Sequence, residues 1–136
     1  MTDAYVPGTC NIGAAEIAVR RRAGHAGLAV TAALAAVLVR APLRRAWRLT
    51  LALPAAGAAA GYLQAQRRFC ADFGFRGVYN FGDRGQERPV ADEQARARDR
   101  RRALQIAATS AAIGLGVALA ATAVPAGSGR TAGGAR

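Results

Sequence analysis

The sequence predicts an all-α integral membrane protein with three transmembrane helices. Three stretches that contain no charged residue lead to this prediction: residues 23–39, 49–66 and 103–129. All 19 basic residues, every one an arginine, and all 8 acidic residues lie outside these stretches. Charged and apolar residues separate into blocks in this way when lipid is one of the solvents, because a charge is costly inside a bilayer.

The chain of 136 residues has room for one domain. We expect a single membrane domain over residues 1–126, with spans at approximately 23–39, 49–66 and 103–124, and a disordered tail at 127–136. A span needs about 20 apolar residues. The first two stretches have only 17 and 18, so the arginines at their ends must reach out to the headgroups.

The first helix is expected to begin before its apolar stretch. Gly13 or Asn11 would cap it, and Glu16 would be the back-reaching member of a capping box. A cleaved signal peptide is the rival interpretation, with Ala33-Leu34-Ala35 as the small-x-small site. The long region before the apolar run, which contains acidic residues, and Arg40 directly after it favour an uncleaved span.

The second span is predicted to begin after a headgroup-level turn that contains Trp47 and Arg48, and to kink at Pro54. Gly57 and Gly61 form a GxxxG pattern in this span. Such small residues let helices approach closely in lipid. The pattern indicates either a face for a dimer or partner or packing against the protein's own helices, and we favour the latter.

Residues 67–90 combine aromatic and glycine residues and are predicted to form a loop or short re-entrant piece at the water boundary. An aromatic belt explains this composition, and a ligand pocket is the alternative. Asp92 is expected to cap the third helix, so that residues 92–102 form a solvated extension of the span. The expected ion pairs there are Asp92 with Arg96 and Asp99 with Arg102, while Gly114 would provide close packing.

Arginine counts predict the orientation. Thirteen arginines fall on the side of the N-terminus and residues 67–102, and six on the other side, which places the N-terminus in the cytoplasm. The four arginines within residues 40–48 oppose this assignment locally. Topology and anionic lipid explain the basic charge, so we expect no nucleic-acid partner. The expected lipid headgroup contacts are Arg96, Arg98, Arg100, Arg101 and Arg102.

Cys10 and Cys70 are the best candidates for chemistry, because three spans place both on one side of the membrane. They could be inert, form a disulfide, or act as thiols in redox or metal chemistry, with His25 as a weak third metal ligand and nearby arginines lowering the pKa of Cys70. Glu16 and Asp72 are expected to neutralise Arg20 and Arg68 rather than to catalyse a reaction.

No span contains an ionisable residue, which argues against proton-coupled transport by this chain alone. No nucleophile, acid and base set or cofactor motif is apparent, so we expect neither an enzyme nor a cofactor. The sequence instead favours a non-enzymatic accessory, assembly or scaffolding component that packs with itself or with a larger membrane complex. A thiol-dependent redox or metal-handling protein that uses Cys10 and Cys70 is the alternative.

Two groups of motifs carry a resemblance. The first is Tyr5-Val6-Pro7-Gly8-Thr9-Cys10-Asn11-Ile12-Gly13 with Glu16-Ile17 and Arg20 to Arg22; the second is Arg68-Phe69-Cys70 with Gly77-Val78-Tyr79-Asn80-Phe81. These segments resemble a group of small bacterial membrane proteins of unknown function. The resemblance covers roughly residues 5–82 and leaves the third span aside. It implies a membrane location and no activity, cofactor or catalytic residue.

Overall fold

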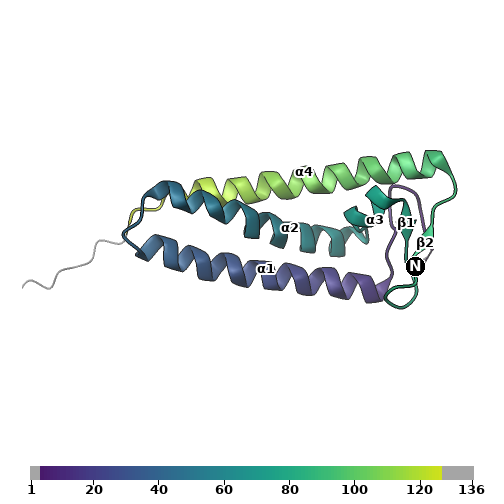
Figure 1. Cartoon of the computed structure of the whole chain (residues 1–136), viewed down its shortest axis with the longest axis horizontal. Coiled ribbons are helices and arrows are strands. Elements are labelled where there is room, and N and C mark those ends of the chain that lie inside the picture. Colours follow the sequence, from purple (N-terminus) through teal and green to yellow (C-terminus); the bar gives the residue numbers. More distant parts are fainter. Residues whose placement is uncertain (1–3, 127–136) are drawn as a thin grey trace, which may run out of the picture.

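A computed structural model describes residues 4–126, and in that range the chain is mostly helical. Three long helical segments lie side by side, and a small cap covers one end of the bundle, near the N-terminus (Figure 1). The elements in order are α1 (Ala14–Arg40), the 3-10 helix η1 (Arg45–Leu51), α2 (Ala52–Arg67), α3 (Ala71–Arg76), β1 (Val78–Tyr79), β2 (Arg88–Pro89) and α4 (Glu93–Ala123). The predicted disordered tail at 127–136 lies outside the described residues.

Two helices, α1 and α4, are long and apolar enough to cross a membrane. The second predicted span, residues 49–66, is not confirmed as a membrane-crossing helix, because α2, the α-helical part of that segment, is only 16 residues long. Four α-helices are present among the described residues rather than three, the additional one being the short α3.

The structure places Pro54 at the beginning of α2 rather than inside a long spanning helix. The segment begins as a 3-10 helix and becomes α-helical at Ala52, so Pro54 is the third residue of α2. In the first turn of an α-helix the backbone N–H groups have no partner four residues earlier. The missing N–H of Pro54 therefore leaves no gap inside the α-helical ladder, and the chain changes helix type before the proline instead.

The two helix starts differ in how well the sequence predicted them. Asp92 caps α4 as expected, accepting hydrogen bonds from the backbone N–H groups of Gln94 at 3.3 Å and Ala95 at 3.0 Å. Gly13 is the N-cap of α1, but no side chain completes a capping box there. The backbone N–H of Gly13 donates instead to the carbonyl of Asn80 at 2.8 Å, in a part of the chain far away in sequence.

The long helices pack through small residues. A methyl group added at Gly61 would meet the backbone of Gly24 in α1, and one added at Gly114 would meet Ala52 and Ala56 in α2. Gly61 and Gly114 are thus the packing residues that the sequence predicted. Gly57 is not, because nothing lies within 4 Å of the position its Cβ would occupy.

The segment 67–90 is more ordered than the loop that we predicted. It contains α3 and the antiparallel pair β1–β2, in which Val78 is opposite Pro89 and Tyr79 opposite Arg88. Phe69 and Phe73 are buried in the core rather than placed in a belt at the surface. Burying these rings against the helices stabilises the cap by the hydrophobic effect.

Candidate functional site

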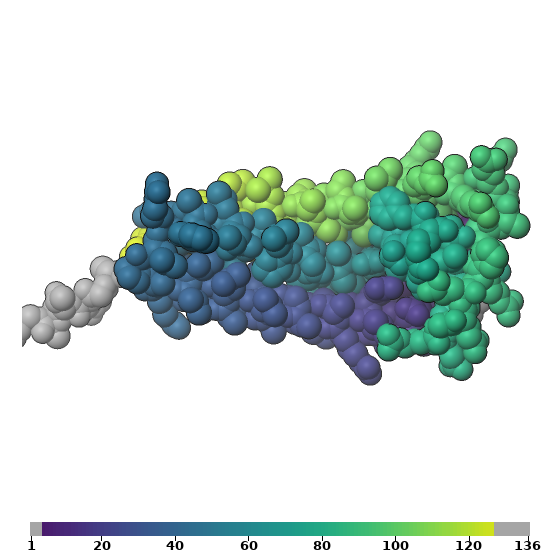
Figure 2. All heavy atoms as spheres, in the orientation of Figure 1, coloured from purple at the N-terminus to yellow at the C-terminus, as the bar shows by residue number. Residues whose placement is uncertain are grey.

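The candidate site is the cap at the N-terminal end of the bundle. We define the cap as residues 4–13, α3, β1–β2 with their connection, and the first two turns of α4. Figure 2 shows that the molecule is wider at this end, where these segments gather. The cap contains most of the hydrogen bonds that join distant parts of the chain.

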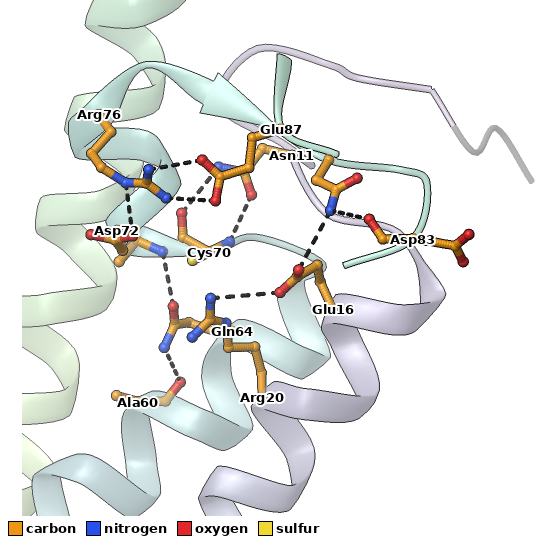
Figure 3. A network of polar contacts seen from close by, with 12 residues as sticks. Asn11, Glu16, Arg20, Ala60, Gln64, Cys70, Asp72, Arg76, Asp83 and Glu87 are labelled. Carbon is orange, nitrogen blue, oxygen red and sulfur yellow. Dashed lines mark hydrogen bonds and ion pairs between the residues drawn. The ribbon is translucent and has the colours of Figure 1, made fainter. Parts of the chain in front are cut away.

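Asn11 is the central residue of the cap. Its side-chain amide donates to the carbonyl of Cys70 at 3.0 Å and accepts from the backbone N–H of Cys70 at 2.7 Å (Figure 3). Its backbone N–H donates to the carbonyl of Arg68 at 3.1 Å, and its own carbonyl accepts from the N–H of Asn80 at 2.9 Å. Asn11 is fully buried, so it joins three segments in a place that water does not reach.

Asn80 has a similar role on the other side of Asn11. Its side-chain amide donates to the carbonyl of Asp83 at 2.9 Å and to the carboxylate of Glu16 at 3.5 Å. Glu16 also forms the predicted ion pair with Arg20, at 3.7 Å. The side-chain oxygen of Asn80 accepts from the N–H of Gly82 at 2.9 Å. These contacts hold the β1–β2 connection against the start of α1.

Gln64 and Arg76 position α3. The side-chain oxygen of Gln64 accepts from the first N–H of α3, that of Ala71, at 2.9 Å. Arg76 at the end of α3 binds Asp72 at 3.0 Å and both carboxylate oxygens of Glu87, at 2.8 and 3.0 Å (Figure 3). The hydrogen bond to Arg76 lowers the pKa of Glu87, and the same bond raises the pKa of Arg76. We predicted that Asp72 would neutralise Arg68, but its ion pair is with Arg76.

Asp99 fastens the N-terminal segment to α4. Its carboxylate accepts from the Tyr5 hydroxyl and from the backbone N–H of Gly8, both at 2.7 Å, and it is fully buried. The ring of Tyr5 stacks on Tyr79 with 4.7 Å between centroids. Burial, together with the bond to Asp99, raises the pKa of Tyr5. The predicted pair of Asp99 with Arg102 is therefore wrong, because Asp99 uses both oxygens elsewhere.

The two thiol candidates differ in their surroundings. Cys10 and Cys70 are both free; the Cys10 thiol donates to the carbonyl of Ala4 at 3.2 Å, and Cys70 is fully buried. Burial raises the pKa of Cys70, so our expectation of a lowered pKa is wrong. His25 belongs to α1 and contacts the Tyr62 hydroxyl at 2.6 Å. Within residues 4–126, no three His, Cys, Asp or Glu side chains gather to hold a metal ion.

The predicted headgroup arginines fall on two sides of α4. Arg98, Arg101 and Arg102 line a hollow next to Gly8. Arg96 and Arg100 line a second hollow together with Glu93. The predicted pair of Arg96 with Asp92 is wrong, since the Nε of Arg96 donates to the carbonyl of Val90 at 2.5 Å.

Arg48 was predicted to mark the headgroup level at the opposite end, but it is fully buried. Its guanidinium donates to the carbonyl of Ala121 at 3.0 Å and to that of Val124 at 2.5 Å, at the C-terminus of α4. A cation at a helix C-terminus interacts favourably with the helix dipole. Arg48 thus ties the start of the returning segment to the end of α4.

Sequence reasoning missed the long-range contacts of Asn11, Asn80, Tyr5 and Asp99: it considered Asn11 only as a helix cap and Asp99 only as a partner of Arg102. The first three lie inside the motifs that carry the resemblance, which was the available signal. The chain matches no protein-family model, no curated protein and no solved structure. The cap's polar side chains bind one another or the backbone, which makes the cap a structural clamp that holds four segments together.

Proposed function

We propose that this protein is an integral membrane protein that crosses the bilayer three times and acts as a non-catalytic accessory, assembly or scaffolding component. One observation carries the proposal: many large apolar side chains of α1 and α4 are exposed on the outside of the bundle, while most of the residues that these two helices bury are small or polar.

The two faces of α4 differ in side-chain size: the buried face has mostly small residues, and the exposed face has large apolar ones, as expected for a helix that faces lipid. Buried positions along its apolar part are Ala103, Ile106, Ser110, Gly114 and Ala118, a stripe with mostly small residues. Its large exposed side chains are Leu104, Ile113, Leu115, Val117 and Leu119. In water a helix places its large apolar residues inside, because each one gains about 1.5–3 kcal/mol on burial. Facing lipid, the same outward residues carry no such cost.

Of the most apolar 18-residue stretch of each helix, only 17% is buried in α1 and 22% in α4. A core helix of a soluble protein of the same composition would be mostly buried. Leu28, Val30 and Val37 make the outer face of α1 apolar as well. The close contact of Gly24 in α1 with Gly61 in α2 supports an α1 that stays in the mature protein rather than a cleaved signal peptide.

The chain direction supports a third crossing. Both α1 and α4 run from the cap to the opposite end, so the segment between them must return to the cap (Figure 1). If α1 and α4 both cross the bilayer, η1 and α2 must cross it too. The α2 helix is about 24 Å long at 1.5 Å per residue, and η1 adds about 14 Å at 2.0 Å per residue. Together they exceed a hydrocarbon core about 30 Å thick.

Arginine placement supports a cytoplasmic cap. Arg20 to Arg22 and residues 96–102 lie at the cap end, and the positive-inside rule assigns the richer side to the cytoplasm. A cap that is closed by its own hydrogen bonds suits a structural role, because it leaves no acid, base and nucleophile grouped together. The raised pKa of the buried Cys70 thiol opposes the thiol-dependent alternative.

We assign association to the exposed surface of α2 around Gly57 and Leu53. Gly57 is exposed and open, and the neighbouring Leu53 is 81% exposed, the highest value among the large apolar residues. Close approach of helices in lipid uses such small residues. The surface would contact a second copy of the chain or another membrane protein.

The test begins with membrane fractionation. We expect the protein to stay in the pellet after alkaline carbonate extraction, and recovery in the supernatant without detergent would refute the membrane assignment. In mild detergent we expect a particle larger than one chain, or a co-purifying partner. Gly57→Ile should reduce it to a single chain, whereas Gly116→Ile, at a glycine that is equally open on α4, should not. A lone wild-type monomer would contradict the scaffolding role.

A further inference from the structure

An arginine-lined hollow lies between the N-terminal segment and α4. It has a volume of about 250 Å³ and is lined by Pro7, Gly8, Arg98, Arg101, Arg102 and Gln105. The four α4 residues follow one another at spacings of three, one and three, which places them on one face of the helix. The hydrogen-bond network of Figure 3 does not include them.

The arginines of this hollow form no ion pair within the described part of the chain. The three ion pairs found there involve only Arg20 and Arg76. Asp99 is the nearest carboxylate in sequence, but its oxygens already accept from Tyr5 and Gly8. Three guanidinium groups therefore share a small space with no carboxylate paired to them.

Arg102 adds an independent observation. Its Nε is buried and has no hydrogen-bond partner within residues 4–126. Its Nη1 reaches the side-chain oxygen of Gln105 only at 3.4 Å. A buried donor without an acceptor is unfavourable, and more so when the group is charged. The buried Nε itself is closed to a ligand, but the protein satisfies the Arg102 guanidinium only in part, and an acceptor in the hollow would bind its terminal N–H groups.

The position of the hollow indicates the source of that acceptor. Arg102 is the last charged residue before the apolar part of α4, which begins at Ala103. In the proposed membrane orientation, on which this step depends, the hollow lies at the level of the lipid headgroups. Arginine binds phosphate oxygens through two parallel N–H donors, and does so more specifically than a point charge.

We propose that the hollow formed by Arg98, Arg101, Arg102 and the Gly8 turn binds a phosphate group, that of an anionic phospholipid in the surrounding leaflet. Free phosphate has the same chemistry and is the other source to be distinguished. The second hollow is less suited, because Glu93 lines it and Arg96 already donates to Val90. Arg100 in that hollow provides a control on the same helix.

The experiment is a lipid titration of the delipidated, detergent-solubilised protein, followed by native mass spectrometry. Phosphatidylglycerol is compared with phosphatidylcholine in 0.5 M ammonium acetate, where screening over about 4 Å suppresses the effect of exposed charges. The wild-type protein should bind phosphatidylglycerol at least about tenfold more strongly than phosphatidylcholine. This is the difference expected from one or two arginine contacts to an anionic lipid. The variant R98Q/R101Q should lose about 30-fold in affinity for it.

The control variant R100Q/R84Q removes the same number of exposed arginines at the same end of the molecule and should lose less than about threefold. Circular dichroism checks that both variants keep their helices. Equal losses in the two variants would overturn the proposal. No preference of the wild-type protein for phosphatidylglycerol or for phosphate would overturn it whether or not any variant folds.

Competition with 10 mM inorganic phosphate separates the sources. Phosphatidylglycerol that stays bound supports a lipid headgroup, and phosphate that displaces it from the wild-type protein supports the free ion in the same hollow. Fractionation keeps this result separate from the proposed function. If the protein sediments with membranes but shows no lipid preference, only the proposed phosphate binding in the hollow is overturned. If the protein is recovered in the supernatant, the membrane assignment is overturned, and titration with phosphate still tests the hollow.

Discussion

The two glycines of the GxxxG pattern provide the sharpest test of the packing, because the same substitution should have opposite effects at each. At Gly61 a new methyl carbon would lie 2.7 Å from the Cα of Gly24 and 2.8 Å from the carbonyl oxygen of Arg20. Both are backbone atoms of α1 and cannot rotate away. At Gly57 the methyl carbon would meet nothing within 4 Å.

The magnitude follows from this geometry. An ordinary contact of a methyl carbon is 3.4 Å or longer, so Gly61→Ala forces α1 and α2 apart by at least about 0.7 Å, because the backbone nitrogen of Gly24 lies closer still than its Cα. A gap of about 0.5–1 Å removes a quarter to a half of the dispersion energy of each contact around it, and overpacking costs about 1–3 kcal/mol. Replacing a helical glycine by alanine returns about 0.5–1 kcal/mol. The net loss at Gly61 is about 1–2 kcal/mol, against a gain of about 0.5–1 kcal/mol at Gly57.

The assay is reversible unfolding of the single chain, at a detergent-to-protein ratio that removes association through Gly57, in mixed micelles of mild detergent and dodecyl sulfate, followed by far-ultraviolet circular dichroism. The two variants should differ by about 2 kcal/mol, or about 30-fold in the ratio of folded to unfolded protein. Both substitutions add one methyl group to the same helix, so each controls for the other. Equal stabilisation by both would refute the close α1–α2 contact, and a larger loss at Gly57 would place the tight contact on the wrong side of α2.

Three further predictions concern single contacts. Asp99→Asn should lower the free energy of unfolding by about 2 kcal/mol, because an amide cannot accept both bonds as the carboxylate does. Tyr5→Phe should lower it by about 1 kcal/mol. Thermal unfolding measures both, and an unchanged stability of Asp99→Asn would contradict the role of Asp99 in holding the cap together. Arg48→Gln should cost about 2 kcal/mol and speed amide hydrogen exchange in the last turn of α4, and unchanged exchange there would show that the guanidinium does not cap that helix. N-ethylmaleimide at neutral pH should label Cys10 at least about tenfold faster than Cys70 in the folded protein, and equal rates would argue against the burial of Cys70.

The raised pKa of Cys70 makes the free energy of unfolding depend on pH in the alkaline range. Below pH 9.0, the ordinary pKa of the thiol, Cys70 is protonated in both the folded and the unfolded chain. Above this pH the unfolded chain loses the proton first, so the free energy of unfolding decreases as pH rises towards the pKa of the folded state. Cys70→Ser should remove this component of the alkaline decrease, which a denaturant titration at pH 8 and pH 10 would measure.

Local patterns predicted what depends on nearby residues. Asp92 caps α4 through N–H groups two and three positions ahead, so the residues that decide this helix start are adjacent in sequence. The ion pair of Glu16 with Arg20 is likewise one helical turn long. The apolar stretches of α1 and α4 were recognised because length and composition alone identify a helix that is able to cross a membrane.

Contacts between distant segments could not be predicted in this way. Asp99 was assigned to Arg102, three residues away, but its partner Tyr5 lies 94 positions earlier. Asn11 and Cys70 are 59 positions apart, and an asparagine in a loop has many local partners available. The change from η1 to α2 before Pro54 occurs where buried Arg48 docks on the end of α4, a constraint that periodicity does not contain.

The sequence by itself determined that three long segments would be helical and where arginine ends the apolar stretches, because composition and one-turn interactions decide these features. Only the tertiary structure decided which way each helix is rotated. The GxxxG pattern is the same string in either case, yet Gly61 faces α1 and Gly57 faces outward, since a helix places residues four apart about 40° from each other and the neighbouring helices select the buried side. The contacts of the cap also depend on the tertiary structure. Its asparagines and Asp99 find their partners only when segments far apart in sequence meet at one end of the bundle.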